Sequence, residues 1–346
     1  MPVPSKKQAS EHTPAERTQE ASTEPVWKRR GRALLYWLIV LQMFGVVLFI
    51  GGLYVAEATR PTFMALYTPR QPLIVVSALA LLLAPVTRRR VRALVVAQIV
   101  LCLIVLFPVM GLHLNLKRSP EKKAIRLVSY NVYFGKLDRV QLMNELAAMD
   151  VDILLIQAPH ESMAARLRER FPDRSVEHID DLIVVSRFKL REVIKPERID
   201  KKIAPMYASY VVETDMGPLG IYNVHPYSPR HALFGGEMAI NLEQRERQIE
   251  AAVLAAKADG APYLVVGDTN LPPWSAIGRR HFEGLTDAFE DVGFGFGYTF
   301  PAKRPWMRID RAFGSEGIRF LNVRVGPLGA SDHRPIFVDF EIVKRR

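Results

Sequence analysis

The sequence of 346 residues contains one cysteine, Cys102, so no disulfide bond can form within a single chain. Cysteine usage therefore does not identify the compartment in which the protein works. The sequence also lacks internal repeats and has no low-complexity tract beyond its N-terminal segment. A disulfide-stapled scaffold is excluded, and nothing in the pattern indicates a repeat architecture.

A strong basic charge is missing from the larger, C-terminal part of the chain. The whole chain has a net charge of +11, but residues 1–114 hold 13 Lys and Arg against 5 Asp and Glu, whereas residues 115–346 hold 34 against 31. Most of the excess therefore flanks apolar segments, where positive residues set the orientation in a membrane. The net charge is not in itself an indication of nucleic-acid binding.

Long apolar runs are present only in the first third of the chain. Residues 1–32 are mostly polar and are predicted to form a disordered cytoplasmic tail. Residues 33–114 are predicted to form a transmembrane region of about three helices, at 33–55, 63–86 and 93–114. The first would span ~35 Å as a helix, which favours a retained anchor over a cleaved signal peptide. The second run is short, so a re-entrant or interfacial helix is the alternative.

The basic residues around these runs predict an orientation. Residues 28–32 and 88–92 contain eight Lys and Arg, whereas the loop between the first two runs contains Arg60 and Arg70. Positively charged loops stay in the cytoplasm. Three spans would therefore make this a multi-pass protein of the cytoplasmic membrane with an extracytoplasmic C-terminal domain. Two spans would leave that domain in the cytoplasm, but would put the two basic clusters on opposite sides.

After a juxtamembrane linker at 115–123, the pattern at 124–346 is mixed. Many short β-rich runs alternate with helical periodicity near 138–149, 161–171 and 239–258, without a long series of βαβ units. This mixture predicts an α+β fold. We expect a four-layer type of α/β sandwich, in which two mixed β-sheets pack face to face and helices cover the outside.

Acidic, amide and imidazole side chains occur where predicted strands give way to loops. Asp268 and Asn270 follow one apolar run, Asp310 lies beside another, and Asp332 and His333 precede the last. Loops on a rigid scaffold are the usual place for chemistry. Oxygen ligands suit a hard divalent cation and imidazole suits proton transfer. The pattern therefore predicts a metal-assisted phosphoester hydrolase site.

These motifs resemble, in content and order, those of the endonuclease/exonuclease/phosphatase superfamily, which includes pancreatic-type deoxyribonuclease. Earlier motifs agree, namely residues 129–132, 152–157, 181–187 and 222–226. The resemblance covers roughly residues 124–342. It implies the sandwich fold of the family and hydrolysis of a phosphate ester with Mg²⁺ or Mn²⁺ as the cofactor.

The resemblance also implies catalytic roles for individual residues. Asp268 would activate a water molecule, with Asn270 as its orienting partner. His333 would contact a phosphoryl oxygen or transfer a proton, and Asp310 would hold its ring. His225 would lie near the phosphate.

The metal ligands implied by the resemblance include one departure. Asn131 and Asp332 occur at the metal-side positions, but the family's glutamate after Gln157 is replaced here by Ala158. A methyl group cannot bind a cation. Glu161 is a candidate replacement, and the alternative is that Glu161 is a solvated residue at a helix start. The departure bears on activity and not on the fold.

The favoured interpretation is a membrane-anchored, divalent-metal-dependent phosphoester hydrolase acting on a lipid-linked or other envelope phosphate. An anchored extracytoplasmic nuclease is the second hypothesis, although a nucleic-acid partner is not favoured because the charge of the domain is nearly balanced. The third is a catalytically impaired phosphate-binding protein, because of Ala158. The sequence does not identify the oligomeric state.

Overall fold

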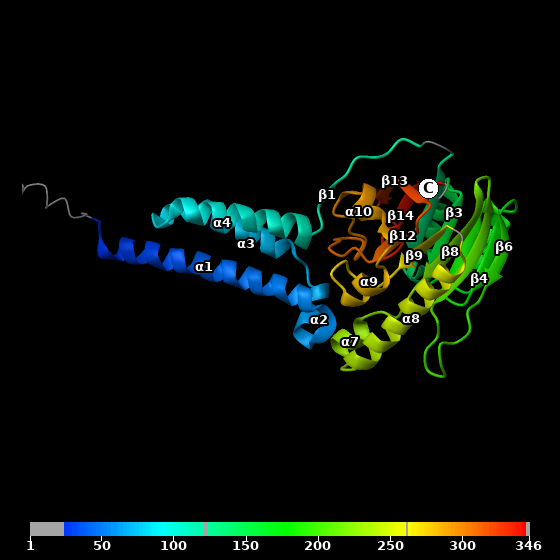
Figure 1. The fold of residues 1–346 in the computed structure, drawn as a ribbon, viewed down its shortest axis with the longest axis horizontal. Coiled ribbons are helices and arrows are strands. Elements are labelled where there is room, and N and C mark those ends of the chain that lie inside the picture. The colour runs from blue at the N-terminus through cyan, green and yellow to red at the C-terminus, as the bar shows by residue number, and fades with distance from the viewer. Residues whose placement is uncertain (1–23, 121–122, 261, 344–346) are drawn as a thin grey trace, which may run out of the picture.

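The computed structural model describes residues 24–120, 123–260 and 262–343, which form a rod of apolar helices and a domain of two β-sheets (Figure 1). Most of the predicted N-terminal tail, residues 1–23, lies outside the described residues. Helix α1 (Val26–Val55) begins inside the segment that was predicted as tail. It follows Pro25, and a helix tolerates proline where its first N–H groups have no partner.

Four helices make up the rod. After α1 come α2 (Arg60–Tyr67), α3 (Gln71–Leu83) and α4 (Val91–Ile104), the last continued by a π-helical turn to Val109. By length and composition, residues 26–58 and 91–109 could each cross a membrane, and α2 with α3 adds a third span if that pair, bent by 84°, is counted as one. Two or three N-terminal helices can therefore cross a membrane.

The bend divides the second predicted span. Thr68 has an extended backbone with φ −80° and ψ 139°, which ends α2. The next residue is Pro69, and a proline disfavours the helical conformation of the residue before it. Pro72 then occupies the first turn of α3, where the missing N–H is not needed. The run at 63–86 is consequently two helices and not one straight helix.

Polar side chains connect the helices of the rod. Gln98 Nε2 of α4 donates to Gln42 Oε1 of α1 at 2.9 Å, and Gln42 Nε2 donates to Ser77 Oγ of α3 at 3.1 Å. Hydrogen bonds between side chains of neighbouring helices are a main source of helix association where apolar contact with lipid is equally favourable. The three helices are thus held as one bundle.

Two mixed six-stranded sheets form the C-terminal domain. In spatial order, the first contains β13 (Ile318–Val325), β14 (Ile336–Ile342), β2 (Ile125–Asn131), β3 (Ile153–Gln157), β5 (Leu182–Ser186) and β4 (Ser175–Ile179), and the second contains β10 (Thr286–Asp287), β12 (Asp310–Gly314), β9 (Tyr263–Asp268), β8 (Gly217–Val224), β7 (Tyr207–Thr214) and β6 (Lys189–Ile194). Within each sheet one pair is parallel, β2 with β3 and β8 with β9, and the other pairs are antiparallel.

The sheets pack face to face, and both of their outer faces are covered. In β9, Leu264 and Val266 lie in the cluster between the sheets, whereas Tyr263 and Val265 lie in the cluster under a helix. This alternation follows from the two-residue period of a strand. The covering helices are α5 (Arg139–Ala148), α6 (Met163–Arg170), α8 (Met238–Ala258) and α9 (Ala276–His281). The four-layer sandwich predicted from the sequence is confirmed.

The rod is docked against the domain. The third predicted span ends at Val109, before Gly111 with φ +74°, and β1 (His113–Leu114) then pairs with β11 (Phe294–Gly295) of the domain. The first part of the predicted linker also lies on the domain, where Arg118 forms a 2.6 Å ion pair with Asp291. Residues 121–122 of the linker lie outside the described residues.

Candidate active site

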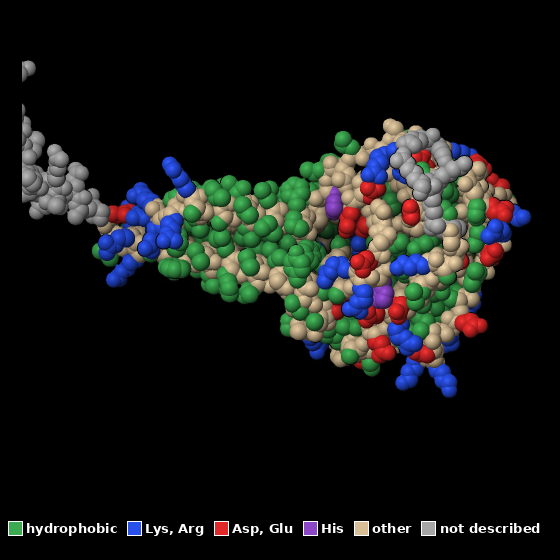
Figure 2. All heavy atoms as spheres, viewed as in Figure 1, with side chains coloured by type: hydrophobic (Ala, Val, Ile, Leu, Met, Phe, Trp, Pro, Cys, Tyr) green, Lys and Arg blue, Asp and Glu red, His purple; other side chains and the backbone are tan. Residues whose placement is uncertain are grey.

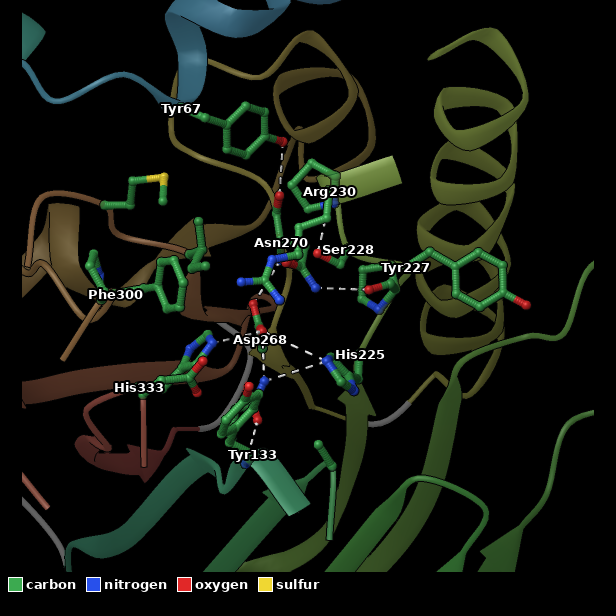
Figure 3. Close-up of a pocket in the computed structure, with 18 of the residues that line it drawn as sticks. Tyr67, Tyr133, His225, Tyr227, Ser228, Arg230, Asp268, Asn270, Phe300 and His333 are labelled. Atoms are coloured by element: carbon green, nitrogen blue, oxygen red, sulfur yellow. Dashed lines mark hydrogen bonds and ion pairs between the residues drawn. The ribbon is translucent and has the colours of Figure 1, made fainter. Parts of the chain in front are cut away.

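Strands of both sheets end at one point of the domain and bring the predicted site residues together (Figure 3). Asn131 ends β2 of the first sheet, and Asp268 ends β9 of the second. Asp310 begins β12 and is the direct cross-strand partner of Asp268. A glycine, Gly267, precedes Asp268, because a Cβ there would clash with the carbonyl group of Val224 on the parallel strand. Because β8 lies close beside β9, His225, the residue after β8, lies next to Asp268.

Carboxylates and imidazoles alternate across the site. His225 Nδ1 lies 2.5 Å from Asp181 Oδ2, and its Nε2 lies 3.7 Å from Asp268 Oδ2. His333 Nε2 lies 3.6 Å from the same oxygen of Asp268, and His333 Nδ1 lies 2.9 Å from Asp310 Oδ2. Asp268 is therefore at the centre of a row of five titratable groups.

Two asparagines fix the carboxylate of Asp268. Asn131 Nδ2 donates to Asp268 Oδ2 at 2.9 Å, and the backbone N–H of Asn270 donates to Asp268 Oδ1 at 2.9 Å. Asn270 has φ +52°, a left-handed conformation in which asparagine is enriched. Its side chain donates to the carbonyl oxygen of Pro226 at 2.9 Å. Asn270 thus orients the loop as well as the carboxylate.

The neighbouring carboxylates raise the pKa of both histidines of the site. Burial by itself would lower the pKa of His333, but the carboxylates of Asp310 and Asp268 outweigh burial and raise this pKa to about 9. Burial opposes the charged form of His225 too, yet the hydrogen bond with Asp181 and the charge of Asp268 raise its pKa. The carboxylates thus favour the protonated form of both rings beside Asp268, with the larger shift on His333.

The residues present fit a divalent cation. Asp268, Asp310 and His333 offer ligand atoms within 4.8 Å of one another among the described residues. However, both nitrogens of His333 face carboxylates, which raise its pKa to about 9 and disfavour this ring as a metal ligand. Asp332 fits better, because it lines the same pocket as Asn131 and its Oδ1 is buried without a hydrogen-bond partner. A bound cation would satisfy that oxygen.

Ala158 lies at the pocket, whereas Glu161, its candidate replacement as a metal ligand, does not. Ala158 lines the pocket, is buried, and has φ +49°. Its backbone is held on both sides, since its N–H donates to Asp181 O at 3.1 Å and its carbonyl accepts from Phe134 N–H at 2.7 Å. Glu161 is exposed in the turn before α6 and is not among the pocket residues. The structure does not bring Glu161 to the cluster.

Three residues of the site were not singled out from the sequence. Asp181, the partner of His225, gave only the weak signal of an acidic residue before a predicted strand. Arg230, in the short helix α7 (Arg230–Phe234), lines the pocket and has no ion pair among the described residues. Tyr67 comes from α2 of the rod, and no sequence pattern linked that segment to the site.

Three groups of the row, His225, Asp268 and His333, line a cavity of about 620 Å³. The cavity has a polar floor and largely apolar walls. The wall residues with large apolar side chains are Tyr67, Phe134, Met206, Tyr227, Leu233, Phe234, Phe300, Trp306 and Met307. A polar phosphate ester could contact the floor while an apolar part of the same molecule contacts the walls.

Comparisons with known proteins agree with this geometry. A sequence model described as the Endonuclease/Exonuclease/phosphatase family matches residues 128–333. No curated protein matches the chain at a significant level.

Several solved structures have the same fold. An endonuclease/exonuclease/phosphatase family protein from Bacteroides thetaiotaomicron is 16% identical, with a TM-score of 0.53 over 65% of this chain and 100% of that one. The mannosyl-6-phosphatase Bt3783 of the same species is 15% identical, with a TM-score of 0.52 over 63% and 100%. Truncated Caenorhabditis elegans TDP2 is 17% identical, with a TM-score of 0.50 over 63% and 97%. At these identities the likeness shows the fold alone.

The central position of Asp268 leads to a prediction about turnover. Asp268→Asn keeps the size of the side chain but removes the proposed base and replaces one of its two acceptor oxygens with a donor, so kcat should fall by about 10²–10⁴-fold. His333→Ala should cost at least as much, because it removes a positive ring from the site. Phosphate release by the folded, purified full chain is the measurement. Wild-type turnover in both variants would show that the site is assigned wrongly.

Proposed function

Because the chain belongs to the endonuclease/exonuclease/phosphatase family, we propose that it hydrolyses a lipid-linked or other envelope phosphate ester with the help of a divalent metal ion. One observation carries this proposal. The acid–histidine row opens into a largely apolar cavity, and a wall of that cavity is Tyr67, a residue of the apolar N-terminal helices.

The proposed reaction replaces a P–O bond to the leaving group with a P–O bond from water. Mg²⁺ or Mn²⁺, held by Asp332 and Asn131, would neutralise charge on the phosphoryl oxygens. Asp268 takes the proton of the attacking water, and the hydrogen bonds from Asn131 and Asn270 hold its carboxylate in place. The leaving oxygen departs with the electron pair of the broken bond and takes up a proton that the protonated ring of His333 supplies.

The positively charged groups of the chain contact the phosphoryl oxygens in this proposal. His225 and His333 present their Nε2 sides toward Asp268, so an oxygen anion beside Asp268 would lie near both rings. Arg230 is exposed at the pocket and offers a planar, permanently charged donor for a second phosphate or phosphoryl group. Charge complementarity of this kind stabilises the transition state more than the substrate.

The position of the pocket beside the rod supports a substrate held in a bilayer. Figure 1 shows α2 and α7 side by side at the junction of rod and domain. Phe234 of α7 lines the pocket and is 81% exposed, which is costly in water but favourable against lipid. An apolar substrate chain leaving the pocket at this end would remain in the membrane.

The charge distribution supports an extracytoplasmic domain. Figure 2 shows Lys and Arg side chains gathered at the end of the rod that lies far from the domain, with hydrophobic side chains between. The positive ends of membrane helices stay in the cytoplasm. The domain at the opposite end would therefore lie on the outer face of the cytoplasmic membrane.

Ala158 supports a second candidate, a phosphate-binding protein with impaired catalysis. The methyl group at this pocket position supplies no oxygen ligand, and Glu161 is not near enough to line the pocket. The remaining polar groups, His225, His333 and Arg230, would still bind a phosphate anion.

A comparison of substrates tests the proposed function. The full chain is reconstituted in lipid vesicles with Mg²⁺ or Mn²⁺ and supplied with a lipid pyrophosphate, a soluble sugar phosphate, or DNA. We expect phosphate release from the lipid substrate to be at least ~10-fold faster than from the sugar phosphate, since the apolar walls bind only the lipid chain. Faster cleavage of DNA would support the anchored nuclease instead, and binding without release would support the binding protein.

Restoring a carboxylate at position 158 tests the metal site. Ala158→Glu should lower the metal concentration needed for half-maximal activity by at least ~10-fold, as expected for a group that supports a metal site. Ala158→Gln is the matched control, because it fills similar space without a charge. Glu161→Ala should change little, because Glu161 is exposed. If Ala158→Glu alters neither the metal requirement nor the rate of a folded enzyme, Ala158 is not at the metal.

The proposed orientation can be tested in cells. With three spans, a C-terminal alkaline phosphatase fusion should be active in intact bacteria, because that enzyme matures outside the cytoplasm. A C-terminal green fluorescent protein fusion should be dark when it is exported unfolded. An inactive phosphatase together with a bright fluorescent fusion would place the domain in the cytoplasm and rule out three spans.

A further inference from the structure

A tyrosine of the membrane-side rod contacts the catalytic loop directly. The hydroxyl of Tyr67, at the end of α2, donates to the carbonyl oxygen of Asn270 at 3.0 Å. The same hydroxyl accepts from Arg245 Nη2 at 2.8 Å. Arg245 Nη2 also lies 2.5 Å from the carbonyl oxygen of Asn270, so the three groups form a closed triangle beside the pocket (Figure 3 shows the Tyr67–Asn270 edge).

Arg245 is an unusual residue to find at this place. It lies in α8, its side chain is 0% exposed, and it has no ion pair with an acidic group among the described residues. Its Nε and Nη1 atoms are buried without a hydrogen-bond partner. Burial of a guanidinium group without a carboxylate is costly. Tyr67 and the carbonyl of Asn270 are the polar contacts that hold it, so removing either one leaves the cation poorly compensated.

The triangle acts on Asp268 through Asn270. The carbonyl oxygen of Asn270 is held by Tyr67 and Arg245, and its side chain is held by Pro226 O at 2.9 Å. These contacts fix a residue in the left-handed conformation, with φ +52°. The N–H of that same residue donates to Asp268 Oδ1. A rotation of Asn270 would therefore withdraw a donor from the proposed base.

We propose that Tyr67 and Arg245 are positioning residues, and that the active site is complete only when the membrane-side rod is docked on the domain. The inference rests on the proposed function, because positioning matters through the hydrolysis that Asp268 performs. Tyr67 lies outside the matched residues 128–333, and Arg245 lies within them but in none of the motifs that the sequence analysis singled out. Hydrolysis would then be coupled to the membrane location of the chain.

Other contacts between rod and domain provide the control. Tyr298 donates its hydroxyl to Met110 O at 2.7 Å, and Trp274 Nε1 donates to Pro108 O at 3.2 Å. Each tyrosine hydroxyl donates to a backbone carbonyl oxygen across the junction. Tyr67 of the rod donates to the domain, and Tyr298 of the domain donates to the rod. Tyr298 does not line the catalytic pocket. Tyr298→Phe therefore removes a docking hydrogen bond of the same kind without touching the catalytic loop.

The test compares Tyr67→Phe with Tyr298→Phe in the full chain reconstituted in vesicles. Tyr67→Phe keeps the ring on the pocket wall and removes only the hydroxyl. We expect kcat on the lipid pyrophosphate to fall by about 10-fold with KM almost unchanged, because a small misplacement of a catalytic group is costly. Tyr298→Phe should retain the wild-type kcat. Arg245→Met should lower kcat in the same way as Tyr67→Phe, because it removes Nη2, the one donor that both oxygens share.

Hydrogen–deuterium exchange gives a readout that does not require turnover. Peptides covering 266–272 should exchange faster in Tyr67→Phe than in the wild type or in Tyr298→Phe, because the Asn270 N–H is released from Asp268. Unchanged exchange and kcat in Tyr67→Phe would overturn the inference, and so would equal losses in both tyrosine variants. A wild type without turnover, but with the selective change in exchange, would refute the proposed hydrolase and leave the positioning of the loop supported.

Discussion

The buried carboxylate of Asp268 is the constraint on which the functional end of the molecule depends. An ionised carboxylate is stable inside a protein only if hydrogen bonds and opposite charges replace its lost hydration. Asn131 and His333 contact Asp268 from the first sheet and the loop before its strand β14, while His225 and Asn270 contact it from loops at the end of the second sheet. The packing of the two sheets and the chemistry of the site therefore meet in a single side chain.

Much of the fold and of this cluster could be predicted from the sequence, because the signals are local. Two-residue periodicity identifies strands, and an acidic or amide residue at the end of an apolar run is placed at the edge of a sheet. These rules placed Asp268, Asn270, Asp310 and His333 where strands give way to loops, and the family resemblance added Asn131 and His225 to the expected site. The pairing of Asp181 with His225 was not predicted, because an acidic residue before a strand is a weak signal by itself.

Two features could not be predicted from the sequence: the division of one predicted helix into two, and the packing of that segment against the domain. The apolar run at 63–86 satisfied a hydropathy pattern, but Pro69 and the extended Thr68 bend it by 84° between α2 and α3. That bend places Tyr67 against the domain, where it contacts Arg245 and Asn270. Composition shows that a segment is apolar and gives no information on which distant surface it covers. The rod of apolar helices thus contributes a residue to the pocket, which only the tertiary structure reveals.

The central claim is that a phosphate ester binds beside Asp268 with its apolar part directed toward the rod. A crystal structure of the full chain in a lipidic mesophase, with Mn²⁺ and a non-hydrolysable lipid phosphonate, tests it most directly. The account predicts phosphorus density between Asp268, His225 and His333, an anomalous signal at Asp332, and an alkyl chain that passes Phe234 toward α2. A phosphonate bound elsewhere, or a chain directed away from the rod, would contradict the account.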